Sequence, residues 1–275
     1  ALCLLAFAGR AWQLEAKSIW WDESLSLYRS RLGLGEILQG VISFPGVTTT
    51  DLHPPLYFLM LAGLTRLAGE SDLTLRYLSL AWAVVLVPLL YVTGTRFWSR
   101  RAGLLAAFLG TLSPFYLWYA QEARMYTMVT ALGLASIYAL DRGVSERRRS
   151  WLVAGALLAV AATYTHYLAL MLLPVLGLRT LWSLRLRSRW RSAALGLLAG
   201  ILFLSLPLGI FAIQRLQLGP EVGREYVPLP ALATDALHAF HAGLTLDRFD
   251  NDSDCLWSNR TFNGVGVCVW HFDKS

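Results

Sequence analysis

Charged residues are scarce in this sequence, and apolar residues are abundant. Of 275 residues, 15% are charged and 56% are hydrophobic, whereas a soluble domain has about 25% charged residues. This deficit excludes an ordinary soluble domain and predicts a polytopic membrane protein whose main partner is the lipid bilayer. The 24 Lys and Arg residues, nearly all arginine, give a net charge of +6. Because the arginines lie between apolar runs, we interpret them as topology signals and expect no nucleic-acid partner.

Sequence signatures of metal and cofactor sites are also missing. The chain has no Walker loop, no zinc-ligand spacing and no glycine-rich dinucleotide turn. The stretch "DRFDNDSD" (247–254) has the aspartate spacing of a calcium loop, but it lacks the glycine at the sixth position and has Thr261 at the twelfth. We therefore predict no cofactor and no metal site, and the sequence leaves a divalent-metal requirement open. Cys255 and Cys268, in the polar tail, would pair only in an oxidising compartment.

What is present in abundance is long apolar runs. A membrane-spanning helix needs about 20 apolar residues, and seven candidates meet this length approximately: 1–19, 77–95, 102–119, 125–141, 151–166, 167–184 and 193–213. An eighth run begins at Pro54 and reaches Arg66 after 12 residues. At about 1.5 Å per residue it covers roughly 18–20 Å, which is too short for a hydrocarbon core of ~30 Å. The spans predict an all-α polytopic membrane protein.

Three arginine-rich links set the expected orientation. They lie at 96–101, 141–150 and 185–192, and each is separated from the next by two spans. All three therefore face one side, which the positive-inside rule identifies as the cytoplasm. Residues 20–76 then form one external loop, with juxtamembrane amphipathic helices over 23–40 and 54–69.

The predicted domain organisation follows from this count. Residues 1–213 form the transmembrane module, and residues 214–275 form an external loop or tail. The chain starts inside an apolar run without an initiator methionine and stops in polar sequence. We expect it to be a fragment that lacks a few N-terminal residues and a C-terminal part.

Six ionisable residues from distant parts of the chain converge on the predicted outer face. They are Asp22, Glu23, His53, Glu122, Arg124 and His166. A single charged residue at a membrane boundary is commonly solvated or snorkelling, and Asp22 also reads as the N-cap of a helix. Six on one side, with almost no acid on the other, predict a functional site.

Four motifs carry a resemblance to a known family. In order, "WWDES", "HPPLYFLML", "SPFYLWYAQEARMYTMVTAL" and "THYLALMLLP" resemble the GT-C membrane glycosyltransferases, over about residues 10–215. The similarity is greatest to the family-39-like group of dolichyl-phosphate-mannose–protein mannosyltransferases and bacterial aminoarabinose transferases. The resemblance implies a GT-C-type transmembrane helical bundle with about seven spans and juxtamembrane helices in the first external loop.

The resemblance also implies an activity and roles for particular residues. Such enzymes move a sugar from a polyprenyl-phosphate carrier to an acceptor on the outer membrane face. Asp22 takes the position of the catalytic base, Glu23 completes an Asp-Glu pair, and Glu122 lies near an acid of the second external loop. His53 stands where relatives have a basic residue before the two prolines.

The chemistry of the transfer leads to the same residues. Attack on the sugar needs a general base for the acceptor's proton, and Asp22 at a water–lipid boundary is suited to this task. The lipid-phosphate leaving group needs cations. The predicted substrate-binding residues are Arg29, His53, Glu122, Arg124, Tyr126 and His166.

The main prediction is thus a multi-pass glycosyltransferase, hexosyl- or pentosyl-transferring, of the plasma membrane. Its partners would be a polyprenyl-phosphate-linked sugar donor and an acceptor protein, lipid or glycan. One alternative is a transporter or flippase of a lipid-linked or sugar substrate, which would place ionisable groups at mid-membrane and show internal repeats. Another is a structural membrane subunit, which would not need clustered acids.

The topology yields a first testable prediction. If residues 20–76 form one external loop, cysteines introduced at Ser43 and Ser71 will both react with a membrane-impermeant thiol reagent added outside intact cells. The endogenous cysteines are replaced first, so that only the introduced thiol reports. Labelling from opposite sides would mean that the 54–69 helix crosses the membrane.

Overall fold

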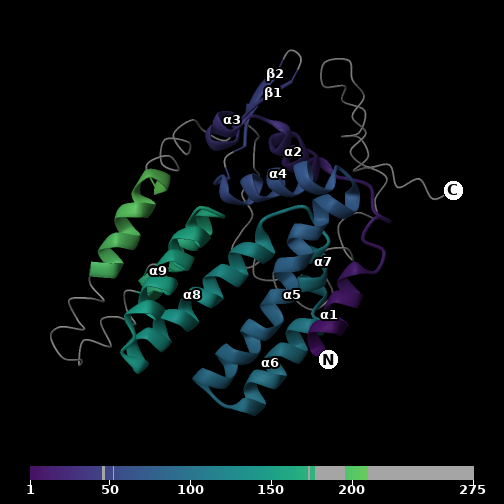
Figure 1. The fold of residues 1–275 in the computed structure, drawn as a ribbon. Helices are drawn as coiled ribbons and strands as arrows, with labels where there is room; N and C mark the ends of the chain where they lie inside the picture. Colours follow the sequence, from purple (N-terminus) through teal and green to yellow (C-terminus); the bar gives the residue numbers. More distant parts are fainter. Residues whose placement is uncertain (45–46, 52, 173, 177–195, 210–275) are drawn as a thin grey trace, which may run out of the picture.

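The protein folds into a bundle of helices covered at one end by a small cap, in a computed structural model that describes residues 1–44, 47–51, 53–172, 174–176 and 196–209 (Figure 1). The bundle contains α1 (Leu2–Ala11), α5 (Asp72–Phe97), α6 (Arg100–Leu112), α7 (Pro114–Ala120), α8 (Tyr126–Glu146) and α9 (Arg149–Thr163). The cap contains α2 (Trp21–Arg31), α3 (Leu34–Gln39), the strands β1 (Val41–Phe44) and β2 (Val47–Thr50), and α4 (Leu56–Ala68). A 3-10 helix, η1 (Tyr167–Met171), follows α9, and a further helix covers Gly196–Gly209.

Helix α5 organises the bundle. It contacts α1, α4, α6, α7 and α8, and it begins at Ser71, whose hydroxyl accepts a hydrogen bond from the Thr74 N–H at 3.1 Å. Asp72 in the first turn complements the positive end of the helix dipole. At the opposite end, Arg96 pairs with Asp141 of α8. Two of the arginine-rich links, 96–101 and 141–150, therefore meet at one end of the bundle, as expected if both face the same side of the membrane.

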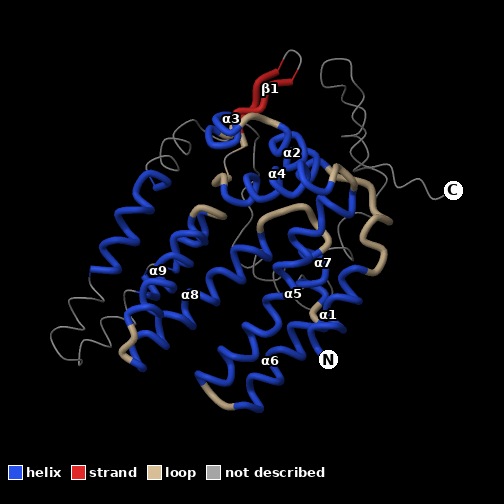
Figure 2. Tube along the Cα trace, in the orientation of Figure 1, coloured by secondary structure: helices blue, strands red, loops and turns tan. Residues whose placement is uncertain are grey.

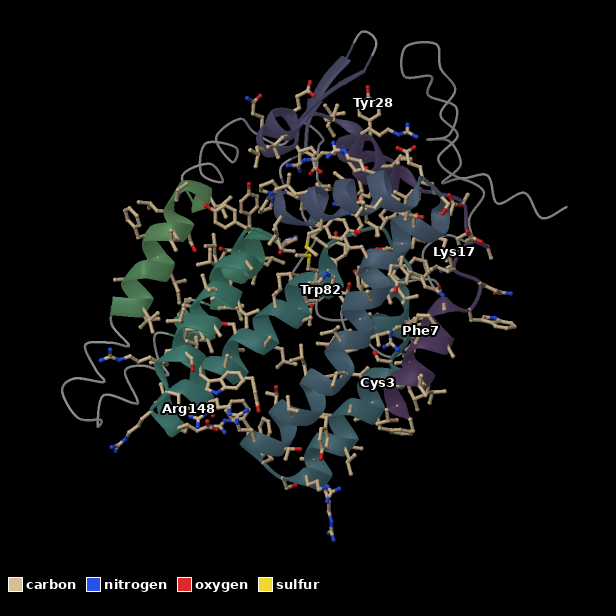
Figure 3. All side chains as sticks on the ribbon, in the orientation of Figure 1. Cys3, Phe7, Lys17, Tyr28, Trp82 and Arg148 are labelled. Carbon is tan, nitrogen blue, oxygen red and sulfur yellow. The ribbon has the colours of Figure 1, made fainter. Side chains whose placement is uncertain are left out.

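The ends of the bundle differ in what surrounds them. Figure 3 places Tyr28, on the cap, and Arg148, in the turn between α8 and α9, at opposite ends of the molecule. The third arginine-rich link, 185–192, and the tail 214–275 lie outside the described residues. The arrangement is that of a bundle with one arginine-lined end and one capped end.

Length and composition support fewer spans than the sequence predicts. Among the described helices, α5 alone is long and apolar enough to cross a membrane, and α6 with α7 passes only as a pair bent by 58°. The predicted seven spans stay a prediction. The expectation of one straight helix over 102–119 is wrong, because Pro114 cannot donate the backbone hydrogen bond that would continue α6. Ser113 instead caps α7, accepting from the Tyr116 N–H at 3.5 Å.

Arg10 stabilises this break. It is buried in α1 and donates to the carbonyls of Gly110 at 2.8 Å and Thr111 at 3.3 Å. These carbonyls belong to the last turn of α6, where backbone acceptors have no partner within the helix and where a cation is favoured. The bend and the buried arginine are thus parts of one arrangement.

The cap departs from the all-α prediction. Its strands form an antiparallel hairpin with Val41 opposite Thr50, which the sequence analysis missed. The helix predicted over 23–40 is two helices, because Leu32 is extended and the Gly33 N–H donates to the Glu36 side chain at 3.0 Å to begin α3 (Figure 2). The helix predicted over 54–69 is confirmed as α4; that it lies along a membrane surface stays a prediction.

An apolar core joins the cap to the bundle. Residues of α4, α5 and α8 with their neighbours form one buried cluster that includes Tyr57, Phe58, Leu61, Leu75 and Met128. Burial of such side chains stabilises a fold by about 1.5–3 kcal/mol each. The cap is therefore a packed part of the fold, and residues carried on it hold fixed positions relative to the bundle.

Close packing of α5 on α6 gives a second prediction. A Cβ atom on Gly103 would collide with the Tyr91 carbonyl and the Thr95 backbone N–H, which cannot move aside. We expect Gly103→Ala to lower the free energy of unfolding in detergent micelles by about 1–3 kcal/mol. The matched control is Gly63→Ala in α4, where nothing lies within 4 Å of the added Cβ. Equal stability of the two variants would contradict the packing described.

Candidate functional site

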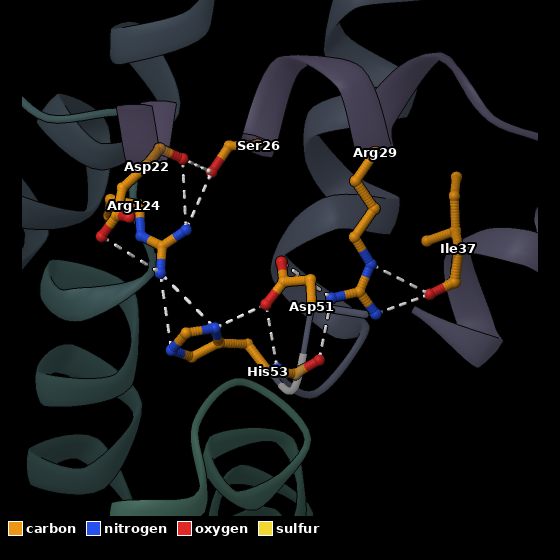
Figure 4. A network of polar contacts seen from close by, with 7 residues as sticks. All are labelled: Asp22, Ser26, Arg29, Ile37, Asp51, His53 and Arg124. Atoms are coloured by element: carbon orange, nitrogen blue, oxygen red, sulfur yellow. Dashed lines mark hydrogen bonds and ion pairs between the residues drawn. The ribbon is translucent and has the colours of Figure 1, made fainter. Parts of the chain in front are cut away.

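A polar site lies where the cap meets the bundle. The start of α2, the segment that follows β2, the 121–125 loop and the beginning of η1 meet there, although they are far apart in sequence. Figure 4 shows Arg124 between Asp22 and Ser26 on one side and His53 on the other, with Asp51 joining His53 to Arg29. The structure thus brings together most of the ionisable residues predicted to converge.

Asp22 is the most accessible acid of the group. It is the second residue of α2, and its side chain is 33% exposed. The N-cap interpretation of Asp22 is wrong, since the extended residue Trp20 occupies that position. The Asp22 carboxylate lies 3.8 Å from Nη2 of Arg124. A partly exposed carboxylate beside a buried cation is available to a reactant.

Glu23 is buried and committed to an ion pair. The sequence predicts it as the partner of Asp22 in catalysis, whereas in the structure both Arg76–Glu23 hydrogen bonds are 2.8 Å long and both side chains are 2% exposed. Glu23 also accepts from the Ala123 N–H at 2.9 Å. Its position is that of an anchor, which ties α2 to α5 and to the 121–125 loop.

Arg76 is an important residue that sequence reasoning missed. Besides Glu23, it donates to the carbonyls of Leu14 at 2.6 Å, Lys17 at 2.9 Å and Ser18 at 3.2 Å. These bonds fix the segment that leads from α1 into α2. In the sequence, an arginine near the start of an apolar helix is interpreted as a topology signal. The structural role of Arg76 is evident only from its buried acid partner in the folded chain.

Arg124 is buried and is the central cation of the site. It donates to the Asp22 carbonyl at 3.3 Å and to the Ser26 hydroxyl at 3.4 Å, and its Nη2 lies 3.4 Å from both ring nitrogens of His53. In the described part of the chain, its Nε has no hydrogen-bond partner. A buried guanidinium with loose and incomplete partners is suited to receive an anion.

Arg29 is predicted to contact the substrate, but its donors serve the protein. It pairs with Asp51 at 3.1 Å, donates twice to the Ile37 carbonyl and once to the His53 carbonyl at 2.9 Å, and lies over the Phe58 ring. The prediction that Arg29 faces a phosphate is therefore wrong. Asp51, its acid partner, also holds His53 and was missed by the sequence analysis.

Glu122 is a buried acid of the 121–125 loop. Burial, together with the negative charge of Glu23, raises its pKa to about 7, although hydrogen bonding by Trp118 and the charge of Arg124 oppose this. The Lys17 ammonium lies 3.9 Å from the centre of the Trp118 ring. At neutral pH the Glu122 carboxyl thus exists in both protonation states, and the protonated form can donate a hydrogen bond.

His166 and Tyr126 border the site through their rings. The His166 ring lies 5.4 Å from that of His53 and 6.0 Å from that of Tyr126, between centroids. Burial, followed by the charges of His53 and Arg124, lowers the pKa of His166 to about 4. Its Nδ1 accepts from the Leu168 N–H at 3.1 Å, and the contact of His166 with the substrate stays a prediction.

No group of three or more His, Cys, Asp or Glu side chains with metal-binding geometry occurs in the described part of the chain. The site consists of the partly exposed carboxylate of Asp22 beside the buried guanidinium of Arg124. Such an arrangement can accept a proton from a hydroxyl group and stabilise an anion a short distance away.

Comparison with known proteins gives one family and three similar structures. The model of the dolichyl-phosphate-mannose-protein mannosyltransferase family matches residues 52–211, more than half of the chain. No curated protein is a significant sequence match.

The solved structures are each 16% identical to this chain. The protein O-mannosyltransferase Pmt1–Pmt2 complex of S. cerevisiae, bound to the sugar donor, aligns with a TM-score of 0.52 over 78% of this chain and 33% of that one. ArnT from Cupriavidus metallidurans aligns with a TM-score of 0.62 over 86% and 46% in the apo state. Bound to undecaprenyl phosphate, it aligns with a TM-score of 0.57 over 78% and 41%. The chain thus spans one third to less than half of the length of these proteins.

The buried ion pair gives a third prediction. Glu23→Gln leaves the Arg76 charge buried without its counter-ion, so we expect the free energy of unfolding to fall by about 3 kcal/mol or more. Glu70→Gln is the control, because Glu70 forms an exposed pair with Arg31 whose loss costs about 1 kcal/mol or less. Thermal and denaturant unfolding in micelles measures both, and equal losses would show that Glu23 is not an anchor.

Proposed function

The chain belongs to the dolichyl-phosphate-mannose-protein mannosyltransferase family of GT-C membrane glycosyltransferases, and on that basis we propose that it is the catalytic part of an integral-membrane glycosyltransferase. The family match bears out the resemblance, and three of the four sequence motifs lie within the matched residues, whereas "WWDES" precedes them. We propose further that the enzyme moves a sugar from a polyprenyl-phosphate-linked donor to a protein, lipid or glycan acceptor on the outer membrane face.

One observation carries this proposal. The exposed carboxylate of Asp22 lies 3.8 Å from the buried guanidinium of Arg124, which is also 3.4 Å from the His53 ring. Sugar transfer from a lipid phosphate needs a base and an anion site close together, because attack and departure occur at one carbon. Asp22 and Arg124 meet this requirement, and they do so at the capped end of the bundle.

The proposed mechanism is a single displacement. Asp22 accepts the proton of the acceptor hydroxyl while the acceptor oxygen forms a bond to C1 of the sugar. The bond from C1 to the phosphate oxygen breaks, and its electron pair leaves with the polyprenyl phosphate. Arg124 and His53 stabilise the charge of the departing phosphate. We propose also that Glu122, in its protonated form, and Tyr126 contact the sugar.

The donor class has support from the similar structures. One of them is bound to its sugar donor and another to undecaprenyl phosphate. The buried Nε of Arg124 has no acceptor among the residues that the structure describes, which is in keeping with an anionic ligand.

The test compares transfer and binding in liposomes that contain the full-length protein. Radiolabelled polyprenyl-phosphate sugars serve as donors, and undecaprenyl phosphate serves as the binding probe. We expect Asp22→Asn to lower transfer by about 10²–10⁴-fold, since the amide cannot accept the proton, while the probe still binds. Arg124→Ala should weaken probe binding, and Arg101→Ala, an exposed arginine at the other end, is its control.

Three outcomes would contradict the proposal. Near-normal transfer by Asp22→Asn would remove Asp22 as the base. Normal probe binding by Arg124→Ala would make Arg124 a structural residue. Movement of the labelled lipid across the bilayer without sugar transfer by the wild-type protein would favour a flippase.

A further inference from the structure

Asp51 is a buried acid that the proposed mechanism does not use. It follows β2, and its backbone N–H donates to the carbonyl of Gly40 at 2.8 Å. We propose that Asp51 is a positioning residue that keeps a hydrogen on Nδ1 of His53, so that Nε2, when it is protonated, donates its hydrogen to the donor phosphate. The phosphate part of this inference rests on the proposed function, whereas the tautomer does not.

The Asp51 carboxylate is itself held in place. Its side chain is 4% exposed, and its Oδ2 lies 3.1 Å from Nη1 of Arg29. Burial alone would raise the pKa of Asp51, but the hydrogen bond and charge of His53, with the charge of Arg29, lower it to about 2. The group is therefore ionised throughout the neutral pH range and acts only as a hydrogen-bond acceptor.

His53 is held at three points by this acid and its arginine. Oδ1 of Asp51 lies 2.6 Å from Nδ1 of the ring and accepts the His53 backbone N–H at 3.1 Å. Arg29 donates to the His53 carbonyl at 2.9 Å. The main chain and the ring are thus both fixed, although the His53 side chain is 28% exposed.

The tautomer follows from the nature of the acceptor. An ionised carboxylate has no proton to give, so a bond of 2.6 Å requires that Nδ1 carry the hydrogen. Nη2 of Arg124 lies 3.4 Å from both ring nitrogens, but Nδ1 already has Asp51 as its partner, so Nε2 is the nitrogen left for a ligand. Asp51 thereby decides which ring nitrogen is available at the anion site, while Arg29 keeps Asp51 from rotating away.

An amide in place of the carboxylate removes this control. Asp51→Asn has the same shape but offers one oxygen where the carboxylate offers two. Arg29 and His53 each need an acceptor on this side chain, so one of them loses its partner. Asp51→Glu restores two acceptor oxygens on a longer side chain and serves as the conservative variant.

The first experiment needs no substitution at Asp51. The full-length protein, with ¹⁵N-labelled histidine, is reconstituted in nanodiscs and examined by NMR, and His53→Gln identifies the His53 signals by their disappearance. The expected result is that the neutral form of the ring carries its hydrogen on Nδ1. A neutral ring with its proton on Nε2, or a mixture of tautomers, overturns the proposal without reference to any ligand.

The second experiment measures binding of undecaprenyl phosphate to the same nanodiscs. At metal sites, an acid that orients a ligating histidine commonly contributes about 10–100-fold to the affinity for the metal. By analogy, we expect Asp51→Asn to lose about 10–100-fold in affinity for undecaprenyl phosphate, with partial recovery in Asp51→Glu. Combined with His53→Gln, Asp51→Asn should cost nothing further, because it acts through the ring. Glu70→Gln, an exposed ion-paired acid, is the control and should bind normally.

The outcomes separate this inference from the proposed function. Normal binding by Asp51→Asn, or a loss that adds fully to that of His53→Gln, overturns the positioning role and leaves Asp51 a structural residue. A wild-type protein that shows the Nδ1–H signature and binds no undecaprenyl phosphate supports the fixed ring and overturns the proposed function.

Discussion

The buried ion pair between Glu23 and Arg76 is the contact on which the site depends. It joins α2 to α5 with two hydrogen bonds of 2.8 Å, and the remaining donors of Arg76 hold the segment before α2. Removing one partner of such a pair leaves an uncompensated charge in the interior, which is strongly destabilising. Because α2 cannot shift while this pair is intact, Asp22 keeps its position beside Arg124.

Burial gives two adjacent acids different tasks. Neighbouring residues in a helix point about 100° apart, so that Asp22 is 33% exposed while Glu23 is buried. The same division recurs across the site, where Asp51 and Arg29 are buried together and His53 projects from them. Glu23 and Asp51 hold the structure through ion pairs, and Asp22 is left for chemistry.

The sequence predicts the regular parts of the fold and much of the site. Apolar runs locate α4, α5, α8 and α9 because burial and helical periodicity extend over many residues. They do not reveal the break at Ser113, which depends on a single proline, or the hairpin in the cap, which lies in a stretch predicted as loop.

Residue types at the capped end also indicate Asp22, His53 and Arg124 as one group. The sequence does not reveal the partners of Arg76 and Arg29, because each pairing joins segments that only the folded chain brings together. The sequence therefore predicts Glu23 and Arg29 as site residues because they are charged. In the structure, a buried ion-pair partner neutralises each of these charges.

The arginine in α1 bears on how the chain is assembled during synthesis. Arg10 lies in the first apolar helix, α1, yet its acceptors, the carbonyls of Gly110 and Thr111, are about a hundred residues later in the chain. A guanidinium without partners is costly inside a membrane. Helix α1 therefore cannot reach its final packing until α6 has been synthesised and has bent.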